Sequence, residues 1–300
     1  MKKLLKVVAP ILAGIFLFAG CTNKEDEPKV MTSETTAAKK GPFQDIINKT
    51  LSLDSLYEKT YITMDVKKDG AAPKRNKLTT EVTTTDKGKN LYISNTSADI
   101  PSLRGEVYMD ESTLLFKPYD SKNFLDITNT PNYQSIVGDV YSGKGNLSNG
   151  KLIKKAYELI NTEDLKFENA SKTIEGKELD FRTAKVTIPG KDAHDDLMEM
   201  LKVILEGDFK TKEELSAFLS KLNFDDVNVT FYVNQDDIIK SVDISIGVSY
   251  DKFEMKINMD SSLIYYNDKS IELPKVDEST VKSYDEYIKN KEKDKPKTNK

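Results

Sequence analysis

The feature that most constrains the fold is a strict alternation of apolar and polar residues in the C-terminal part of the chain. It runs through "DVNVTFYV" (226–233), "SVDISIGVSY" (241–250) and "FEMKINM" (253–259). Successive side chains of a β-strand point to opposite faces, so each segment is predicted to be a strand with one buried face. "NQDD" (234–237) has the length of a hairpin turn between the first two segments. These residues therefore predict an antiparallel sheet.

Similar alternation in shorter stretches extends this prediction toward the N-terminus. Further strands are expected at residues 60–66, 77–85, 90–94, 105–109, 113–117 and 179–188. "DKGK" (86–89) and "DES" (110–112) separate neighbouring members of this series, and their composition is typical of turns.

Helical periodicity is confined to a few segments. "DAHDDLMEMLKVILEG" (192–207) carries an apolar stripe and ends at a glycine, which is typical of a helix C-terminus. "TKEELSAFLSKL" (211–222) follows, with Thr211 and Glu214 spaced as a capping box. Two further helices are expected at 42–59 and 149–160. We therefore predict an α+β fold in which two adjoining helices are inserted between sheet segments.

The chain begins with the pattern of a secretory signal peptide. Residues 1–20 contain three lysines, an apolar run from Val7 to Phe18 and two small residues. The run is shorter than the roughly 20 apolar residues that cross a bilayer as a helix, which disfavours a transmembrane anchor. Cys21 follows directly and is the only cysteine, so the chain cannot form an internal disulfide.

The segment Phe18-Ala19-Gly20-Cys21 resembles a bacterial lipobox, although leucine is commoner than phenylalanine at its first position. The resemblance implies a diacylglyceryl thioether on Cys21 and cleavage between Gly20 and Cys21. It also implies attachment to the extracytoplasmic face of the cell membrane. Two acyl chains suffice for stable anchoring, because each buried methylene contributes about 0.8 kcal/mol. The alternative is an ordinary signal peptide followed by a fortuitous cysteine.

Composition divides the chain into four segments. We predict a signal peptide (1–20), a lipidated cysteine with a flexible tether (21–42), a folded domain (43–276) and a lysine-rich disordered tail (277–300). The tether and the tail hold too few large apolar residues to offset the entropy cost of ordering them. The folded segment is long enough to bury a substantial core.

The charge of the chain argues against nucleic acid as a partner. Loss of residues 1–20 removes three lysines and no acids, so the formal net charge changes from −4 to −7. Only three basic residues are arginines, the usual bidentate readers of phosphates and bases. A nucleic-acid interface needs a basic face, which this acidic mature chain does not predict.

The sequence does not predict an enzyme, a metal site or a cofactor. His194, the only histidine, lies at a helix start among charged residues and is interpreted as an exposed first-turn residue. Three aspartate pairs, at 195–196, 225–226 and 236–237, fall where caps and turns are expected and lack calcium-loop spacing. One histidine and one cysteine cannot build a zinc site, and no phosphate-binding loop is present.

The apolar residues of the helices and the last strands could fill a core or line a cavity. Methionine-rich faces adapt to loosely specified apolar ligands, which favours a cavity for a hydrophobic or amphipathic molecule such as a lipid. The predicted ligand-binding residues are Leu197, Leu201, Ile204, Phe218 and Leu222 from the helices and Phe231, Val233, Ile244 and Ile246 from the strands. A register shift of one residue would turn a strand's whole set outward.

The order of the predicted elements resembles the LolA and LppX-like superfamily of bacterial envelope proteins. The likeness covers most of the folded segment and is most specific at its end, "SSLIYYNDKSIELPKV" (261–276). In Gram-positive lipoproteins of this type a similar tyrosine-asparagine segment, here Tyr265-Tyr266-Asn267, precedes an isoleucine and a proline. The resemblance implies a curved antiparallel sheet, a half-barrel, with helices over its concave face and an apolar cavity between. Relatives carry lipid chains or lipidated proteins, but no ligand-contact residue transfers by motif.

These observations leave two main functional hypotheses. The first is a membrane-anchored surface lipoprotein that binds a hydrophobic or amphipathic ligand between sheet and helices, without catalysis. The second is a structural or interaction lipoprotein whose sheet surface docks another cell-envelope component without a ligand cavity. A third, an enzyme, would need His194 or an aspartate pair to be catalytic.

Overall fold

The computed structural model describes most of the predicted folded segment. The described residues are 43–68, 71–100, 104–110, 112–119, 121–129, 155–160, 166–205 and 211–293. The predicted signal peptide, Cys21 and the tether lie outside these ranges. Among the described helices, none is both long and apolar enough to cross a membrane.

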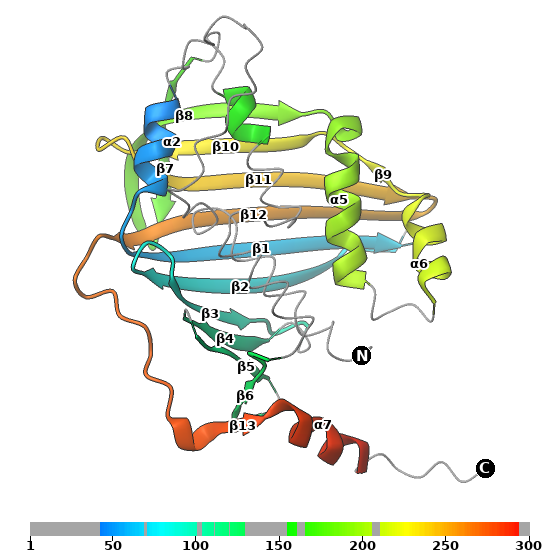
Figure 1. Cartoon of the computed structure of the whole chain (residues 1–300). Coiled ribbons are helices and arrows are strands. Elements are labelled where there is room, and N and C mark those ends of the chain that lie inside the picture. The colour runs from blue at the N-terminus through cyan, green and yellow to red at the C-terminus, as the bar shows by residue number, and fades with distance from the viewer. Residues whose placement is uncertain are drawn as a thin grey trace, which may run out of the picture.

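The strands of the described residues form one 13-stranded sheet. They are β1 (Leu56–Lys68), β2 (Lys74–Thr85), β3 (Asn90–Thr96), β4 (Gly105–Met109), β5 (Leu114–Pro118), β6 (Phe124–Asp126), β7 (Glu168–Ile174), β8 (Lys177–Ile188), β9 (Asn223–Phe224), β10 (Val227–Val233), β11 (Ile239–Tyr250), β12 (Phe253–Tyr266) and β13 (Val281–Ser283). Their order is β13-β6-β5-β4-β3-β2-β1-β12-β11-β10-β8-β7, with β9 beside β11. The sheet is curved and its end strands do not pair, so it stays open (Figure 1). The predicted curved antiparallel sheet is confirmed, except that β13 pairs with β6 in parallel.

The pairing of β1 with β12 joins the two halves of the folded domain. Strands β1 to β6 pair in chain order, and β10 to β12 do the same. β1 is aligned with β12 from Leu56 opposite Tyr266 to Lys68 opposite Phe253. The centre of the sheet therefore consists of the first and the last long strands. Each half supplies the hydrogen-bond partners for the innermost strand of the other.

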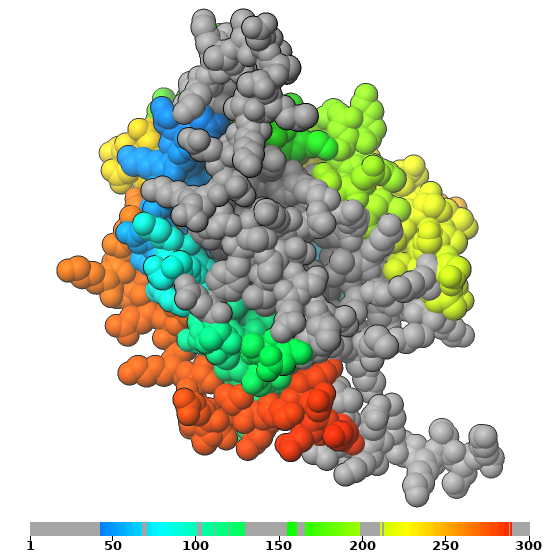
Figure 2. All heavy atoms as spheres, viewed as in Figure 1, coloured from blue at the N-terminus to red at the C-terminus, as the bar shows by residue number. Residues whose placement is uncertain are grey.

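The helices of the described residues are α2 (Gln44–Leu51), α5 (Gly190–Leu205), α6 (Lys212–Leu219), α7 (Tyr284–Lys293), a helical segment at 155–160 and the 3-10 turn η2 (Glu278–Thr280). The predicted helices at 192–207 and 211–222 are confirmed by α5 and α6. The hydroxyl of Thr211 accepts a hydrogen bond from the Glu214 backbone N–H at 3.1 Å, as the capping box predicts. Figure 1 shows α2 in front of one end of β8, β10 and β11 and α5 crossing in front of the other end of the sheet, and in Figure 2 their side chains flank this side of the molecule to the left and right.

One face of the sheet, here called the inner face, packs against these helices. Cross-strand alignment places Val229, Ile244, Met259 and Ile62 side by side on it, across β10, β11, β12 and β1. The buried cluster on this face also contains side chains from α2, α5 and α6, among them Ile47, Leu197 and Leu219. Burial of the shared apolar face is thus the main force that holds helices and sheet together.

The β7–β8 hairpin folds over the opposite, outer face. Its turn, Glu175–Gly176, has positive φ at both residues, the geometry of a two-residue hairpin turn. The ammonium of Lys172 in β7 lies 2.9 Å from the carboxylate of Asp260 in β12. At the tip, the Glu175 carboxylate accepts a hydrogen bond from the Tyr61 hydroxyl of β1 at 2.8 Å. The hairpin therefore reaches across the outer face as far as β1.

The predicted helix at 42–59 is too long. α2 ends at Leu51 and β1 begins at Leu56, so the second half of the predicted helix belongs to a turn and a strand. β1 pairs along its length with both β2 and β12, and these tertiary hydrogen bonds outweigh the local helical pattern. Glu58 consequently lies in a central strand.

The structure also differs from the predicted disordered tail (277–300) over residues 278–293. This part forms η2, β13 and α7, while residues 294–300 lie outside the described ranges. Val281 of β13 lies opposite Phe124 of β6, so the segment finds hydrogen-bond partners at a sheet edge, which composition does not reveal. Burial in this packing raises the pKa of the Tyr284 hydroxyl to about 12.

Candidate functional site

The structure brings the predicted ligand-binding residues together in one buried cluster. Its members include Leu197, Leu222, Phe231, Val233, Ile244 and Ile246, and Phe218 packs against it. The side chains of Leu201 and Ile204 lie outside the described part of the chain. Leu197, Phe231 and Val233 are 0% exposed, so protein atoms surround them on all sides. Their role in ligand binding stays a prediction.

A second apolar group on the inner face is only half-buried. Its members, here called the methionine patch, are Met64, Val66, Met255, Ile257 and Met259 of β1 and β12. Val66 lies opposite Met255, and Met64 lies opposite Ile257. Met255, Ile257 and Met259 pack against the buried cluster, so the patch continues its apolar surface. Methionine side chains are flexible and polarisable, which suits contact with varied apolar groups.

Polar side chains interrupt this apolar face in a row across four strands. The row, here called the polar row, consists of Ser261, Thr60, Thr80 and Asn95, which are aligned as neighbours from β12 to β3. The Thr60 hydroxyl donates to Ser261 Oγ at 2.9 Å, and the Thr80 hydroxyl donates to Asn95 Oδ1 at 2.7 Å. All four are at most 4% exposed, so each depends on protein partners for its hydrogen bonds.

Glu58 lies beside the polar row and is fully buried. Its Oε1 accepts a hydrogen bond from the Ser261 hydroxyl and lies 3.1 Å from the Thr60 hydroxyl, whose single proton is shared between this oxygen and Ser261 Oγ. Its Oε2 has no hydrogen-bond partner in the part of the chain that the structure describes. A β-bulge at Ile264 of β12 shifts the register next to this residue, a device often found near functional sites.

The environment of Glu58 changes the chemistry of its carboxyl. Burial raises the pKa of this group from 4.5 to about 7, although the hydrogen bonds from Ser261 and Thr60 lower it. The carboxyl is therefore close to half-protonated at neutral pH. Its Oε2 can donate a hydrogen bond when protonated and accept one when ionised.

A second buried polar atom on this face lacks a described partner. Asn76 of β2 lies opposite Met64, at the edge of the methionine patch, and is 8% exposed. Its Oδ1 forms no hydrogen bond within the described residues. The inner face thus combines a half-buried apolar patch with two buried oxygens that can accept hydrogen bonds, the chemistry that suits an amphipathic molecule.

The residues considered for catalysis or metal binding have local structural contacts. His194 Nδ1 lies 3.0 Å from the carboxylate of the exposed Asp195, and its ring meets the Phe224 ring edge-on. Asp226 Oδ1 accepts a hydrogen bond from the Gly190 N–H at the start of α5. Throughout the described ranges, no three histidine, cysteine or acidic side chains are grouped so that they could hold a metal ion.

Sequence reasoning missed the polar row and Glu58, because it assigned Glu58 to a helix. A signal was available: Leu56, Glu58, Thr60 and Ile62 follow period two, which places the glutamate and the threonine on the apolar face of a strand. Recognising that face required extending the strand beyond its predicted start at residue 60.

Comparisons with known proteins add little to this description. No family model and no curated protein matches the chain. Among solved structures, a LolA superfamily protein from Nitrosomonas europaea is 10% identical, with 79% of this chain and 99% of that chain covered and a TM-score of 0.24. A putative outer membrane lipoprotein-sorting protein domain from Vibrio parahaemolyticus is 8% identical, with 74% and 88% covered and a TM-score of 0.20. Lipovitellin is 9% identical, with 76% and 26% covered and a TM-score of 0.27. Such low TM-scores carry no argument about this chain.

Proposed function

We propose that this protein is a membrane-anchored lipoprotein that binds a hydrophobic or amphipathic ligand on the inner face of its sheet, without catalysis. In this proposal a lipid on Cys21 attaches it to the extracytoplasmic face of the cell membrane. The signal-peptide pattern and the lipobox-like segment support the anchor. In the same proposal the helices α2, α5 and α6 cover the concave side of the sheet, and the ligand lies between them and the strands.

The observation that carries the ligand proposal is Glu58 Oε2, a buried oxygen without a hydrogen-bond partner among the described residues, on the same face of β1 as the methionine patch. A buried polar atom without a partner costs about 1 to 3 kcal/mol, and a ligand group that pairs with it removes that cost. Glu58 and Met64 are six residues apart on the same face of β1, which corresponds to about 20 Å. A molecule laid along β1 can therefore place a polar group at Glu58 and an apolar chain over the methionine patch.

Apolar contact provides most of the affinity in this arrangement. Each methylene transferred from water to the patch contributes about 0.8 kcal/mol. Glu58 fixes the position and direction of the ligand rather than the bulk of its binding energy, since few polar groups orient ligands in mostly apolar sites. The proposed ligand therefore has a long apolar part and one polar group able to exchange hydrogen bonds with a carboxyl.

Native mass spectrometry of the full chain, released from detergent, tests this function. We expect a bound apolar species in the wild type and its loss in Ile257→Asp, which introduces a charge into the methionine patch. Lys256→Asp is the matched control, because it introduces the same residue at the neighbouring exposed position of β12. An empty wild type, or equal occupancy in both variants, would contradict the proposal.

The alternative, an interaction lipoprotein without a ligand cavity, is favoured by aromatic residues on the outer face. The rings of Tyr57 and Tyr265 stack with their centroids 6.2 Å apart. Tyr265 and Tyr61 are 54% and 43% exposed, and exposed tyrosines are common in protein interfaces. Crosslinking in intact cells distinguishes the two functions: a partner captured by the wild type and lost in Tyr265→Ala, with no bound apolar species, supports the alternative.

A further inference from the structure

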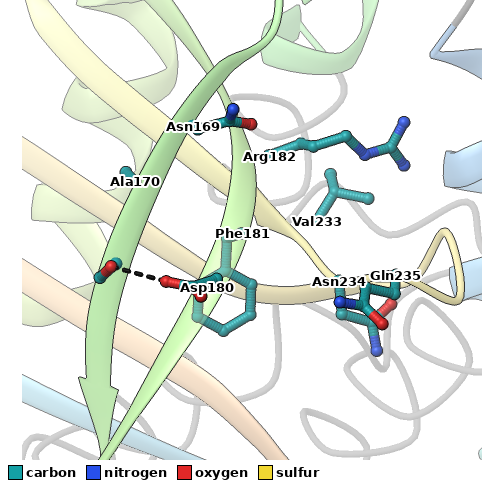
Figure 3. Close-up of a pocket in the computed structure, with 9 residues that line it drawn as sticks. Asn169, Ala170, Asp180, Phe181, Arg182, Val233, Asn234 and Gln235 are labelled. Carbon is teal, nitrogen blue, oxygen red and sulfur yellow. Dashed lines mark hydrogen bonds between the residues drawn. The ribbon is translucent and has the colours of Figure 1, made fainter.

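A pocket of about 490 Å³ opens where the β7–β8 hairpin leaves the rest of the sheet. The last aligned pair between β8 and β10 is Arg182 opposite Val233. Beyond it β8 bends away toward the outer face, whereas β10 ends in the turn that leads to β11. The pocket lies in the resulting gap, with residues of β7 and β8 on one side and of the turn on the other (Figure 3).

The rim formed by the β10–β11 turn is held in place by its own hydrogen bonds. Asn234 Oδ1 accepts hydrogen bonds from the backbone N–H groups of Asp236 and Ile238, each at 3.0 Å. The Asn234 side-chain amide also donates to the Tyr266 hydroxyl at 3.0 Å. The pocket wall therefore exists before any ligand arrives, which lowers the entropy cost of binding.

The charged groups of the pocket already have partners. Arg182 forms an ion pair with Asp237 and lies over the Phe167 ring, with its guanidinium carbon 4.9 Å from the ring centroid. The carboxylate of Asp180 accepts a hydrogen bond from the Ser171 hydroxyl at 2.7 Å. A ligand does not have to carry a charge to satisfy these groups.

Two side-chain amides in the pocket are free to bind a ligand. Asn169 of β7 and Gln235 of the turn are exposed, lie on opposite sides of the pocket and form no side-chain hydrogen bond with any described residue (Figure 3). Each amide offers two donors and an acceptor. Phe181, 5% exposed, also lines the pocket and offers it a small aromatic surface.

We infer that this pocket is a second binding site, for a neutral saccharide. Hydroxyl groups of a sugar donate and accept hydrogen bonds, as do the amides of Asn169 and Gln235, and its C–H groups can pack against Phe181. An apolar lipid would gain nothing from the two exposed amides, which can keep their hydrogen bonds to water. An anion would meet the carboxylates of Asp180 and Asp237 as well as Arg182. The volume lies within the usual range of small-ligand pockets, so a short oligosaccharide is the expected size.

Calorimetric titration of the full chain in lipid nanodiscs tests this inference. The probes are two neutral trisaccharides, maltotriose and triacetylchitotriose, with sialyllactose as an anionic comparison. We expect saturable binding of at least one neutral trisaccharide, weakened at least tenfold by Gln235→Ala and by Asn169→Ala. Asn223→Ala, an exposed asparagine of β9 outside the pocket, is the matched control and keeps wild-type affinity.

Three results would overturn the inference: no saturable binding of either neutral trisaccharide, binding that both pocket variants leave unchanged, or tighter binding of the anionic saccharide. Thermal unfolding of each variant checks its fold, and Gln235→Glu, which keeps the side-chain shape, replaces Gln235→Ala if that variant is unfolded. Ile257→Asp, in the methionine patch of the inner face, retains saccharide binding, because no residue of that patch lines the pocket. The inference therefore does not depend on the ligand proposed there.

Discussion

The carboxyl of Glu58 is buried among apolar strands, and this burial raises its pKa from 4.5 to about 7. Removing a carboxylate from water disfavours its charged form, and the hydroxyls of Ser261 and Thr60 compensate only one of its two oxygens. Protonation of the Glu58 carboxyl therefore changes the free energy of unfolding. The polar row supplies the only hydrogen bonds that this side chain forms within the described residues.

We expect the free energy of unfolding to decrease as the pH rises from about 4.5 to about 7. In this window the folded state keeps the Glu58 proton while the unfolded state has lost it, so ionisation favours the unfolded chain. The shift corresponds to about 3 kcal/mol across the window. Urea unfolding of the wild type and of Glu58→Gln between pH 4.5 and 8 measures it. Glu58→Gln is expected to flatten the slope, and equal slopes would refute this role of Glu58.

Cys21 is the residue on which the predicted membrane attachment depends. We expect the mature wild-type chain to begin at residue 21, to carry a diacylglyceryl group and to sediment with membranes. Cys21→Ser is expected to lack the added mass and to remain largely in the soluble fraction, because two acyl chains are needed for stable anchoring. Intact-mass spectrometry of fractionated cells measures both properties. A wild type cleaved elsewhere and without added mass would be an ordinary secreted protein.

At the level of elements, the β7–β8 hairpin contacts the outer face through Lys172 as well as through the hydrogen bond between Glu175 and Tyr61. The Lys172 side chain is only 10% exposed and contacts the carboxylates of Asp243 and Asp260. These two aspartates are direct cross-strand partners on β11 and β12, and like charges so placed repel each other. The Lys172 ammonium also lies over the Tyr232 ring, 4.4 Å from its centroid. The hairpin therefore neutralises two like charges, on Asp243 and Asp260, whose repulsion would otherwise weaken the sheet.

We expect Lys172→Met to lower the free energy of unfolding by about 1 to 2 kcal/mol, less than for a fully buried pair because both aspartates are partly exposed. It should also speed hydrogen exchange in the β7–β8 hairpin. Adding Asp243→Asn to this variant is expected to recover part of the loss, since the repulsion disappears. Urea unfolding and hydrogen exchange measure these effects. A Lys172→Met variant as stable as the wild type would show that the hairpin is held by other contacts.

At the scale of the whole molecule, an open sheet has two edges, and the chain covers one of them with its own C-terminal segment. β13 occupies the free side of β6, and α7 contacts both of these strands. Uncovered strand edges offer unpaired backbone groups to other chains and promote association. The C-terminal segment thus protects the sheet on the β6 side.

We expect a chain that ends at residue 277 to fold but to associate with itself through the exposed edge of β6. The central strands lie far from this edge in the strand order, so their unfolding transition should change little. Size-exclusion chromatography with light scattering, combined with hydrogen exchange of residues 124–126, measures both effects. A monomeric truncated chain with unchanged exchange at β6 would mean that β13 has no protective role.

The amino-acid pattern predicted most strands and the faces they present. Phe231 and Val233 share a face with Ile244 and Ile246, as the alternation requires, and the observed register confirms it. The pattern did not reveal the short strands β6, β9 and β13, nor the seven-residue strand β7. In β7 the side chain that packs on the sheet is the charged Lys172 and not an apolar residue. The sequence of β7 therefore lacks the apolar–polar alternation that predicts a strand.

The largely antiparallel sheet with inserted helices is predictable from the amino-acid sequence, because side-chain alternation and helix capping are local properties. Three features become visible in the three-dimensional structure alone: β1 lies between β2 and β12, Glu58 is buried beside the polar row, and the β7–β8 hairpin crosses the outer face. Each of these depends on pairing between segments far apart in the chain. Local propensities cannot encode such pairing, because its free energy arises only when both partners are in place.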